Sequence, residues 1–98
     1  AGRVAEARQR LARWLEGHPE DTDARFAHAE DFLLEGDFAG AREAYGKLLA
    51  QVGRVPEVLN NYAFASLQAG AREEALAAAR EAHGLAPQDA AVLDTLGW

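Results

Sequence analysis

The feature that most constrains this chain is a repeat with a period of 34 residues. Glycine recurs at this spacing at Gly2, Gly36 and Gly70, and alanine recurs at Ala7, Ala41 and Ala75. Further aligned sets are Leu11, Tyr45 and Ala79, then Ala29, Ala63 and Gly97, while Pro19 and Pro87 lie two periods apart with Gly53 midway. A fixed period of this length is typical of a solenoid, in which each unit buries its apolar face against its neighbours. The repeat therefore predicts the shape of the protein, and by itself it does not predict a function.

The spacing of apolar residues predicts helices throughout the chain. Val4, Ala7 and Leu11 recur at intervals of three and four, and no stretch alternates with period two. Glycines and prolines divide the pattern into segments. We expect six helices, at about residues 3–16, 22–35, 38–52, 56–69, 72–84 and 90–98. Short loops make each helix antiparallel to the one before it, so the expected fold is all-α, an α-solenoid of antiparallel helix pairs.

Charge and composition narrow the classes of partner. The formal net charge is −6, although residues 1–16 contain four arginines and only two glutamates. An acidic body repels phosphate backbones, which argues against nucleic acid as a partner. The chain has no cysteine, which excludes a disulfide framework and thiolate catalysis. No run of about 18 apolar residues is present, so we expect no membrane span.

The residues at the repeated positions resemble the tetratricopeptide repeat (TPR) family. One unit carries the resemblance through Leu59, Asn60, Asn61, Tyr62, Ala63, Gly70, Glu74, Ala75, Leu76, Ala82, Ala86 and Pro87. The preceding unit matches through Ala29, Phe32, Gly36, Asp37, Phe38, Ala41, Tyr45 and Leu48. It departs from the family at Gly53, where a proline is usual, and at Arg25, where a bulky apolar residue is usual. The resemblance implies a right-handed superhelix with small residues where paired helices cross. A side chain larger than alanine at Ala41, Ala63 or Ala75 would hold those helices apart.

In this register, residues 1–98 form a single TPR-like domain. Residues 22–55 and 56–89 are two full repeats, residues 1–21 are the second helix of a partial repeat, and residues 90–98 are the first helix of a truncated one. The chain opens on alanine and contains no methionine, so we expect a segment of a longer protein. Residues 92–98 also resemble bacterial members of the family, including periplasmic lipoproteins of exopolysaccharide and protein-sorting systems. The compartment stays open between bacterial cytoplasm and periplasm.

The resemblance implies that the first helix of each unit lines a concave groove that holds an extended peptide or a partner helix. The groove positions are Asp23, Phe26, Glu30, Leu33 and Leu34 in one unit, then Glu57, Asn60, Asn61, Phe64, Leu67 and Gln68, then Ala91, Asp94 and Trp98. Of these, the binding residues we select are Phe26, Glu30, Asn60, Asn61, Phe64, Asp94 and Trp98. Phe32, Leu33 and Leu67 are expected to pack against neighbouring helices instead. Such a groove would prefer ligands with apolar anchors and basic flanks.

Two better-known groove types do not fit these residues. Family members that grip a C-terminal carboxylate need Lys and Asn where this chain has Phe26 and Glu30, and basic residues where it has Ala91 and Thr95. A carboxylate facing Glu30 without cationic partners would be repelled. An asparagine ladder along the groove would need repeats of Asn61, but the equivalent positions are Ala27 and Thr95.

The sequence does not predict an enzyme, a metal site or a cofactor. Its densest polar cluster is His28, Glu30, Asp31, Glu35 and Asp37. His28 and Asp31, three residues apart on a helix, share a face as a general base and its orienting carboxylate would. No HExxH motif, phosphate loop or nucleophile elbow accompanies them. A packing or surface role for His28 is favoured over catalysis or metal binding.

A structural role is the alternative to peptide binding. A chain ending in an unpaired first helix and beginning with an unpaired second helix is complementary to itself. Head-to-tail contact would bury Leu93, Leu96 and Trp98 at ~1.5–3 kcal/mol for each large side chain. Contacts of this type produce open filaments or rings, so homo-oligomers through the terminal helices are a second hypothesis.

Overall fold

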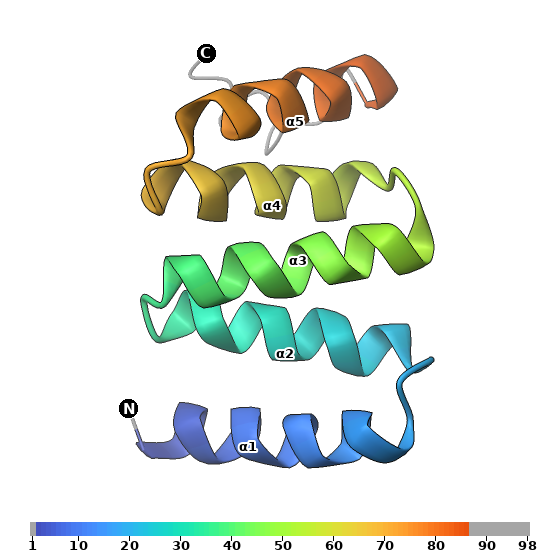
Figure 1. Cartoon of the computed structure of the whole chain (residues 1–98), viewed down its shortest axis with the longest axis vertical. Coiled ribbons are helices and arrows are strands. Elements are labelled where there is room, and N and C mark those ends of the chain that lie inside the picture. The colour runs from blue at the N-terminus through green and yellow to red at the C-terminus, as the bar shows by residue number, and fades with distance from the viewer. Residues whose placement is uncertain (1, 87–98) are drawn as a thin grey trace.

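A computed structural model describes residues 2–86, and within this range the chain is helical apart from short connections (Figure 1). The helices are α1 (Gly2–Gly17), α2 (Thr22–Leu34), α3 (Phe38–Val52), α4 (Pro56–Gln68) and α5 (Arg72–Leu85). Each helix packs against the next one in chain order and runs antiparallel to it. The prediction of an all-α fold is therefore confirmed for this range. The sixth expected helix, residues 90–98, lies outside the described residues.

Local sequence signals explain where the helices begin. Asp21 and Asp37 precede α2 and α3, and their carboxylates accept hydrogen bonds from the backbone N–H groups of Ala24 and Gly40 at 3.0 and 2.9 Å. Aspartate is favoured at this position because its side chain satisfies a backbone donor that the helix leaves unpaired. Pro56 is the first residue of α4, where its missing N–H is not needed. These signals place the helix starts at the predicted residues.

The 34-residue repeat is visible in the backbone at the ends of α2 and α4. Gly36 and Gly70 have positive φ angles of 77° and 90°. The N–H groups of Gly36 and Gly70 donate to the carbonyls three residues earlier, and those of Asp37 and Ala71 donate to the carbonyls five residues earlier. This pair of bonds is the Schellman motif, which ends a helix and reverses the chain. Both units therefore use the same turn to join their two helices.

The turn gives a testable difference between two glycines. We expect Gly70→Ala to lower the free energy of unfolding by ~1–2 kcal/mol, because an alanine Cβ is disfavoured at positive φ. Gly84 in α5 has an open surrounding and no positive φ, so Gly84→Ala should raise the same free energy by ~0.5–1 kcal/mol. Chemical denaturation of the two variants and the wild type measures both effects. Equal effects of the two substitutions would contradict the assigned turn.

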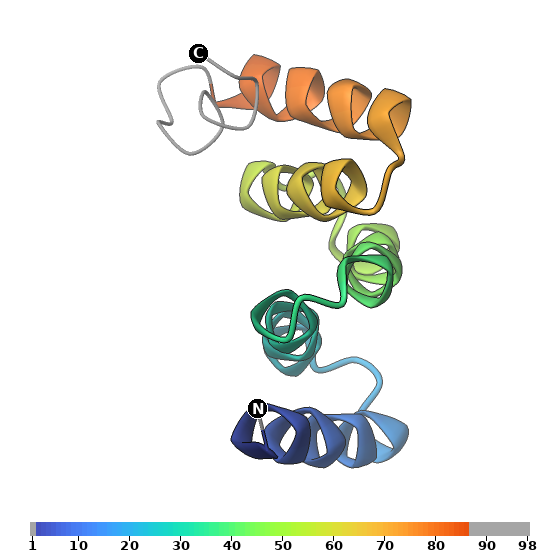
Figure 2. The same ribbon diagram turned by 90° about the vertical axis from the view of Figure 1, so that its left-hand side faces the viewer.

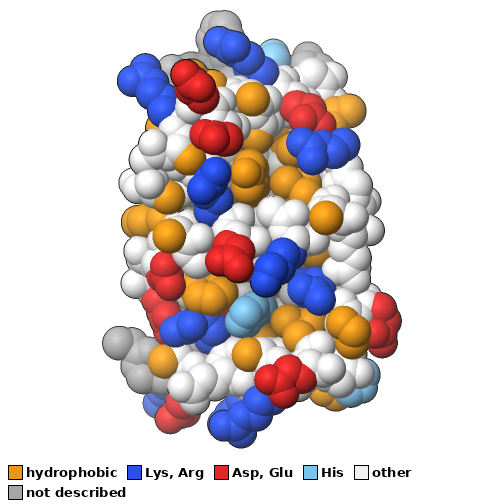
Figure 3. Space-filling model, in the orientation of Figure 1, with side chains coloured by type: hydrophobic (Ala, Val, Ile, Leu, Met, Phe, Trp, Pro, Cys, Tyr) orange, Lys and Arg blue, Asp and Glu red, His pale blue; other side chains and the backbone are white. Residues whose placement is uncertain are grey.

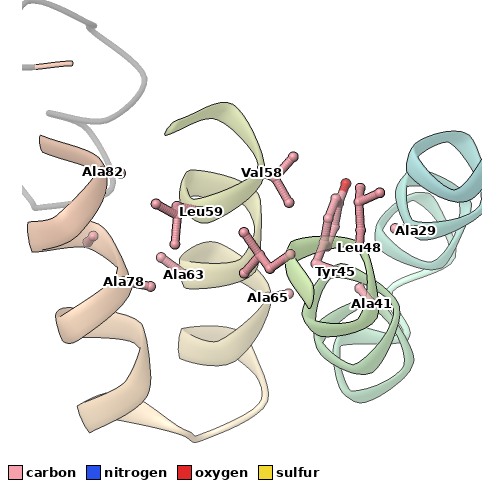
Figure 4. Close-up of a cluster of buried hydrophobic side chains, with 12 residues drawn as sticks. Ala29, Ala41, Tyr45, Leu48, Val58, Leu59, Ala63, Ala65, Ala78 and Ala82 are labelled. Atoms are coloured by element: carbon pink, nitrogen blue, oxygen red, sulfur yellow. The ribbon is translucent and has the colours of Figure 1, made fainter. Parts of the chain in front are cut away.

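Small residues let the helices approach closely in the core. Ala29, Ala41 and Ala63 have no exposed surface, and Ala75 is 4% exposed. Figure 4 shows Ala63 and Leu59 directed from α4 toward Ala78 and Ala82 on α5. It also shows Tyr45 and Leu48 on α3. The largest fully buried side chains are Tyr45, Leu48, Leu59 and Ser66. The expected burial of alanine at 41, 63 and 75 is therefore confirmed.

The helices do not lie in one plane. Figure 2 shows α2 and α4 on one side of the stack, with α3 displaced toward the other. Both α2 and α4 pack against α3, so α3 has a neighbouring helix on each side. This arrangement positions the candidate site.

Overpacking should separate the helix pair formed by α4 and α5. We expect Ala63→Leu to cost ~1–3 kcal/mol of stability, because the added atoms have no space between the two helices. The matched control is Ala77→Leu, at an exposed position of α5, which should change stability by less than ~0.5 kcal/mol. Thermal melts followed by circular dichroism compare the two. A tolerated leucine at position 63 would refute close packing there.

Candidate functional site

The selected binding residues that the structure describes come from two helices that flank α3. Phe26 and Glu30 lie on α2, and Asn60, Asn61 and Phe64 lie on α4. Asp94 and Trp98 lie outside the described residues. Phe26, Glu30, Asn61 and Phe64 each contact a side chain of α3 or change its pKa. Asn60 is half-buried on α4. We call the set Phe26, Glu30, Glu57, Asn61 and Phe64, together with Phe38 and Tyr45 of α3, the central row.

The middle of the central row is built around Tyr45. This side chain has no exposed surface, and its ring meets the edge of the Phe26 ring with the centroids 5.9 Å apart. Burial raises the pKa of Tyr45, and the Glu30 carboxylate raises it further. Asn61 lies beside the phenol and opposes this shift, and Glu57 adds to it weakly. Polar groups from α2 and α4 therefore converge on one buried phenol.

The Tyr45 hydroxyl has no well-formed hydrogen bond to any part of the chain that the structure describes. A buried polar group in this condition costs ~1–3 kcal/mol relative to a satisfied one. The Asn61 amide is close enough to affect the Tyr45 pKa, but the two groups do not reach hydrogen-bond geometry. The middle of the row thus contains a buried phenol, whose pKa the Glu30 and Glu57 carboxylates raise electrostatically.

One end of the central row opens into a hollow of about 310 Å³ between α2, α3 and α4. It is lined by Thr22, Asp23, Phe26, Leu48, Val52, Val55, Glu57 and Val58. Three of these, Asp23, Phe26 and Glu57, are positions that the sequence assigned to the groove. We call this space the acidic hollow, because the ionisable groups that line it within residues 2–86 are the carboxylates of Asp23 and Glu57.

The other end of the central row is an aromatic pair. The ring of Phe38, at the start of α3, meets Phe64 on α4 edge to face with the centroids 6.1 Å apart. Phe64 keeps 43% of its surface exposed, so it combines a packing contact with an accessible face. Phe38 was named only among the residues that resemble the repeat family, and no signal at its repeat position indicated that it would contact Phe64.

The leucines near the row divide between core and surface. Phe32 and Leu33 pack against the buried cluster as expected. Leu67, which was also expected to pack against a neighbouring helix, is instead 45% exposed. Leu34 is 73% exposed in the last turn of α2.

A second hollow, of about 350 Å³, lies between α1, α2 and α3, and sequence reasoning did not identify it. It is lined by Ala12, Leu15, Glu16, Arg25, His28, Phe32, Gly40, Glu43, Ala44 and Lys47. Its cause is visible in the repeat. One period later, Leu59 and Tyr62 stand where this unit has Arg25 and His28, and Leu59 is fully buried. Two polar side chains in place of two large apolar ones leave this space.

Arg25 has a structural use in holding the connection between α1 and α2. Its Nε donates to the carbonyl of Pro19 at 2.8 Å, and Nε2 of Gln51 donates to the same carbonyl at 3.0 Å. The connection between α1 and α2 is therefore held from both α2 and α3. Trp14 holds it as well, since its Nε1 donates to the Asp21 carboxylate at 2.8 Å.

His28 lies half-buried at the second hollow and contacts the Phe32 ring edge to face, with centroids 5.0 Å apart. Figure 3 shows acidic and basic side chains interspersed over this face of the molecule. Burial lowers the pKa of His28, the positive charge of Arg8 lowers it further, and Asp31 opposes this. One carboxylate oxygen of Asp31 is buried without a hydrogen-bond partner in the described range.

Two features are absent from residues 2–86, namely a cluster of metal-binding side chains and a helix that could span a membrane. In that range no three His, Cys, Asp or Glu side chains are grouped so that they would hold a metal ion. None of its helices combines the length and the apolar character needed to cross a bilayer.

The sequence matches no protein-family model, and it matches no curated protein.

The lowered pKa of His28 predicts a pH-dependent stability. His28 is harder to protonate in the folded state than in the unfolded state. At a pH where the unfolded state binds this proton and the folded state does not, protonation therefore shifts the equilibrium toward unfolding. The contribution of neutral His28 to the free energy of unfolding is complete above about pH 6.5, and it is lost as the pH falls toward the folded-state pKa of His28. We expect the wild-type melting temperature to fall more than that of His28→Gln between about pH 7.5 and 5.5. Parallel curves for the two proteins would contradict this assignment.

Proposed function

We propose that this chain is a non-catalytic, TPR-like solenoid scaffold that binds an extended peptide along the central row. The proposed solenoid is supported by the 34-residue period and by the identical turns that end α2 and α4. The observation that carries the proposed function is the acidic hollow, because Asp23, Phe26 and Glu57 from two different helices line one space. The resemblance implies groove positions for all three residues, and Phe26 is also one of the selected binding residues.

The dimensions of the row suit a short extended segment. From Phe38 to Val52, α3 rises by ~21 Å at ~1.5 Å per residue. An extended peptide covers that length with about six residues, at ~3.3 Å each. Over this length the row offers an aromatic pair, a polar middle and the acidic hollow, in that order along α3.

The chemistry of the row indicates the chemistry of the ligand. Phe26 and Phe64 offer apolar surface at separate points, and aromatic side chains are frequent energetic centres of interfaces. Glu30 and Glu57 are acidic, and both raise the pKa of the Tyr45 phenol electrostatically. A ligand with two apolar anchors and basic residues near them complements this pattern, in a chain whose formal charge is −6.

A random linear peptide library displayed on phage tests this proposal directly. We expect panning against the wild-type chain to enrich peptides, and Phe26→Glu or Phe64→Glu to weaken their binding at least ~10-fold in solution, because each adds a charge at an apolar anchor. The matched control is Ala50→Glu, which adds the same charge at an exposed position of α3 on the side away from Phe38, Tyr45 and Val52. All three variants must first retain the helicity of the wild type.

Two results would remove the proposal. One is the failure of the library to enrich any peptide. The other is an equal loss of affinity in the row variants and in Ala50→Glu. In either case head-to-tail assembly through the terminal helices becomes the better hypothesis, and sedimentation at high protein concentration then examines it.

A further inference from the structure

We propose that the acidic hollow is a pocket for one basic side chain, lysine or arginine, of the bound peptide. This inference rests on the proposed function and names the residue type that the site selects. It follows from the walls of the hollow, from its two carboxylates and from the absence of a cation within the described residues to neutralise them.

The walls of the acidic hollow suit the aliphatic part of such a side chain. Val52, Val55 and Val58 come from the end of α3, the connection and the start of α4, and Leu48 and Phe26 complete the apolar lining. Lysine and arginine carry three or four methylenes that pack against apolar surface while the charged group stays near water. The ring of Phe26 also offers a face to a cation.

The two carboxylates occupy different walls of the same hollow. Asp23 lies in the first turn of α2 and Glu57 lies in the first turn of α4. An acidic residue in a first turn is favoured by the helix dipole, and this explains one carboxylate on each helix. The dipole does not explain why both side chains border one apolar-walled space between the two helices. A bound cation is favoured by both carboxylates at once.

No basic side chain within residues 2–86 forms an ion pair with Asp23 or Glu57. The connection between α3 and α4 does contain an arginine, Arg54. Its guanidinium is held instead by Glu81 of α5, with Nε and one terminal nitrogen 2.6 and 2.8 Å from the two carboxylate oxygens. The same pairing lowers the pKa of Glu81. Arg54, which adjoins Val55 of the hollow in sequence, is therefore already engaged elsewhere. Arg25, which adjoins Phe26, lines the second hollow and donates to the carbonyl of Pro19.

Other side chains fit the acidic hollow less well. An acidic side chain would be repelled by two carboxylates, and a purely apolar one would fill the walls while removing water from Asp23 and Glu57 without replacing it. A basic side chain satisfies the apolar walls and the charged rim together. The peptide that binds the row therefore carries its basic residue at the end next to the α3–α4 connection.

The peptides enriched on the wild-type chain are the probe for this pocket. We expect a lysine or arginine at one fixed position of the enriched peptides. In a synthetic peptide, replacing this residue by norleucine keeps the aliphatic stem and removes the charge. This change should weaken binding to the wild-type chain by about 5–10-fold at low salt, and by less at high salt.

A double-mutant cycle assigns that loss to the two carboxylates. On Asp23→Asn/Glu57→Gln, the lysine and norleucine peptides should bind within about twofold of each other. The matched control is Glu6→Gln/Glu73→Gln, which removes two exposed carboxylates from α1 and α5 and changes the net charge equally. On this control the preference for lysine should stay as large as on the wild type.

The outcomes separate this inference from the proposed function. Enriched peptides that lack a fixed basic residue, or that bind equally with norleucine, overturn the pocket and leave peptide binding intact. A preference for lysine that falls equally in both double variants also overturns the pocket, because it would reflect net charge alone. Failure to enrich any peptide overturns both proposals.

Discussion

The close approach of neighbouring helices at alanine positions is the constraint on which the rest of this structure depends. Ala29, Ala41 and Ala63 have no exposed surface, and each stands at the same point of its unit as an alanine or glycine one period away. Where the contact between two helices consists of alanines, the larger side chains must lie on either side of it. On α2 this places Phe26 toward one hollow and Phe32 toward the other. The positions of the large side chains in the candidate site therefore follow from buried alanines that are not themselves part of the site.

Tyr45 shows how the core and the central row are joined in one residue. Its ring fills the space between α2 and α4, and its hydroxyl reaches a position where Glu30 and Asn61 lie nearby without a well-formed hydrogen bond. Phenylalanine would fill the same volume without the cost of an unsatisfied hydroxyl. In the next unit the equivalent residue is Ala79, which brings no polar group. The polar middle is therefore specific to one unit and gives the row a distinct centre.

The repeat predicted the helices well, because helix starts and ends are encoded locally. Asp37, Pro56 and Gly70 each specify a boundary through their own backbone or cap chemistry, and α3 has the predicted bounds. Contacts between helices were harder to predict. The pairing of Phe38 with Phe64 and the exposure of Leu67 depend on how far each side chain reaches across a neighbouring helix, which periodicity does not specify. The second hollow had a signal in the sequence, namely Arg25 and His28 where the next unit has Leu59 and Tyr62, but its size depends on α1 and α3 as well.

The two hollows differ in charge more than in size, and charge decides which one suits a partner. The larger hollow, between α1, α2 and α3, contains Arg25 and Lys47 together with Glu16 and Glu43, and Lys47 already lies 3.5 Å from Glu43. Its charges balance one another, so it has little electrostatic preference for a ligand. Among the described residues, the acidic hollow is lined by two carboxylates and by no basic side chain, and Glu30 adds a third carboxylate to the central row. Because uncompensated charge governs both the encounter rate and the selection of partners, the smaller hollow has the stronger basis for specific binding.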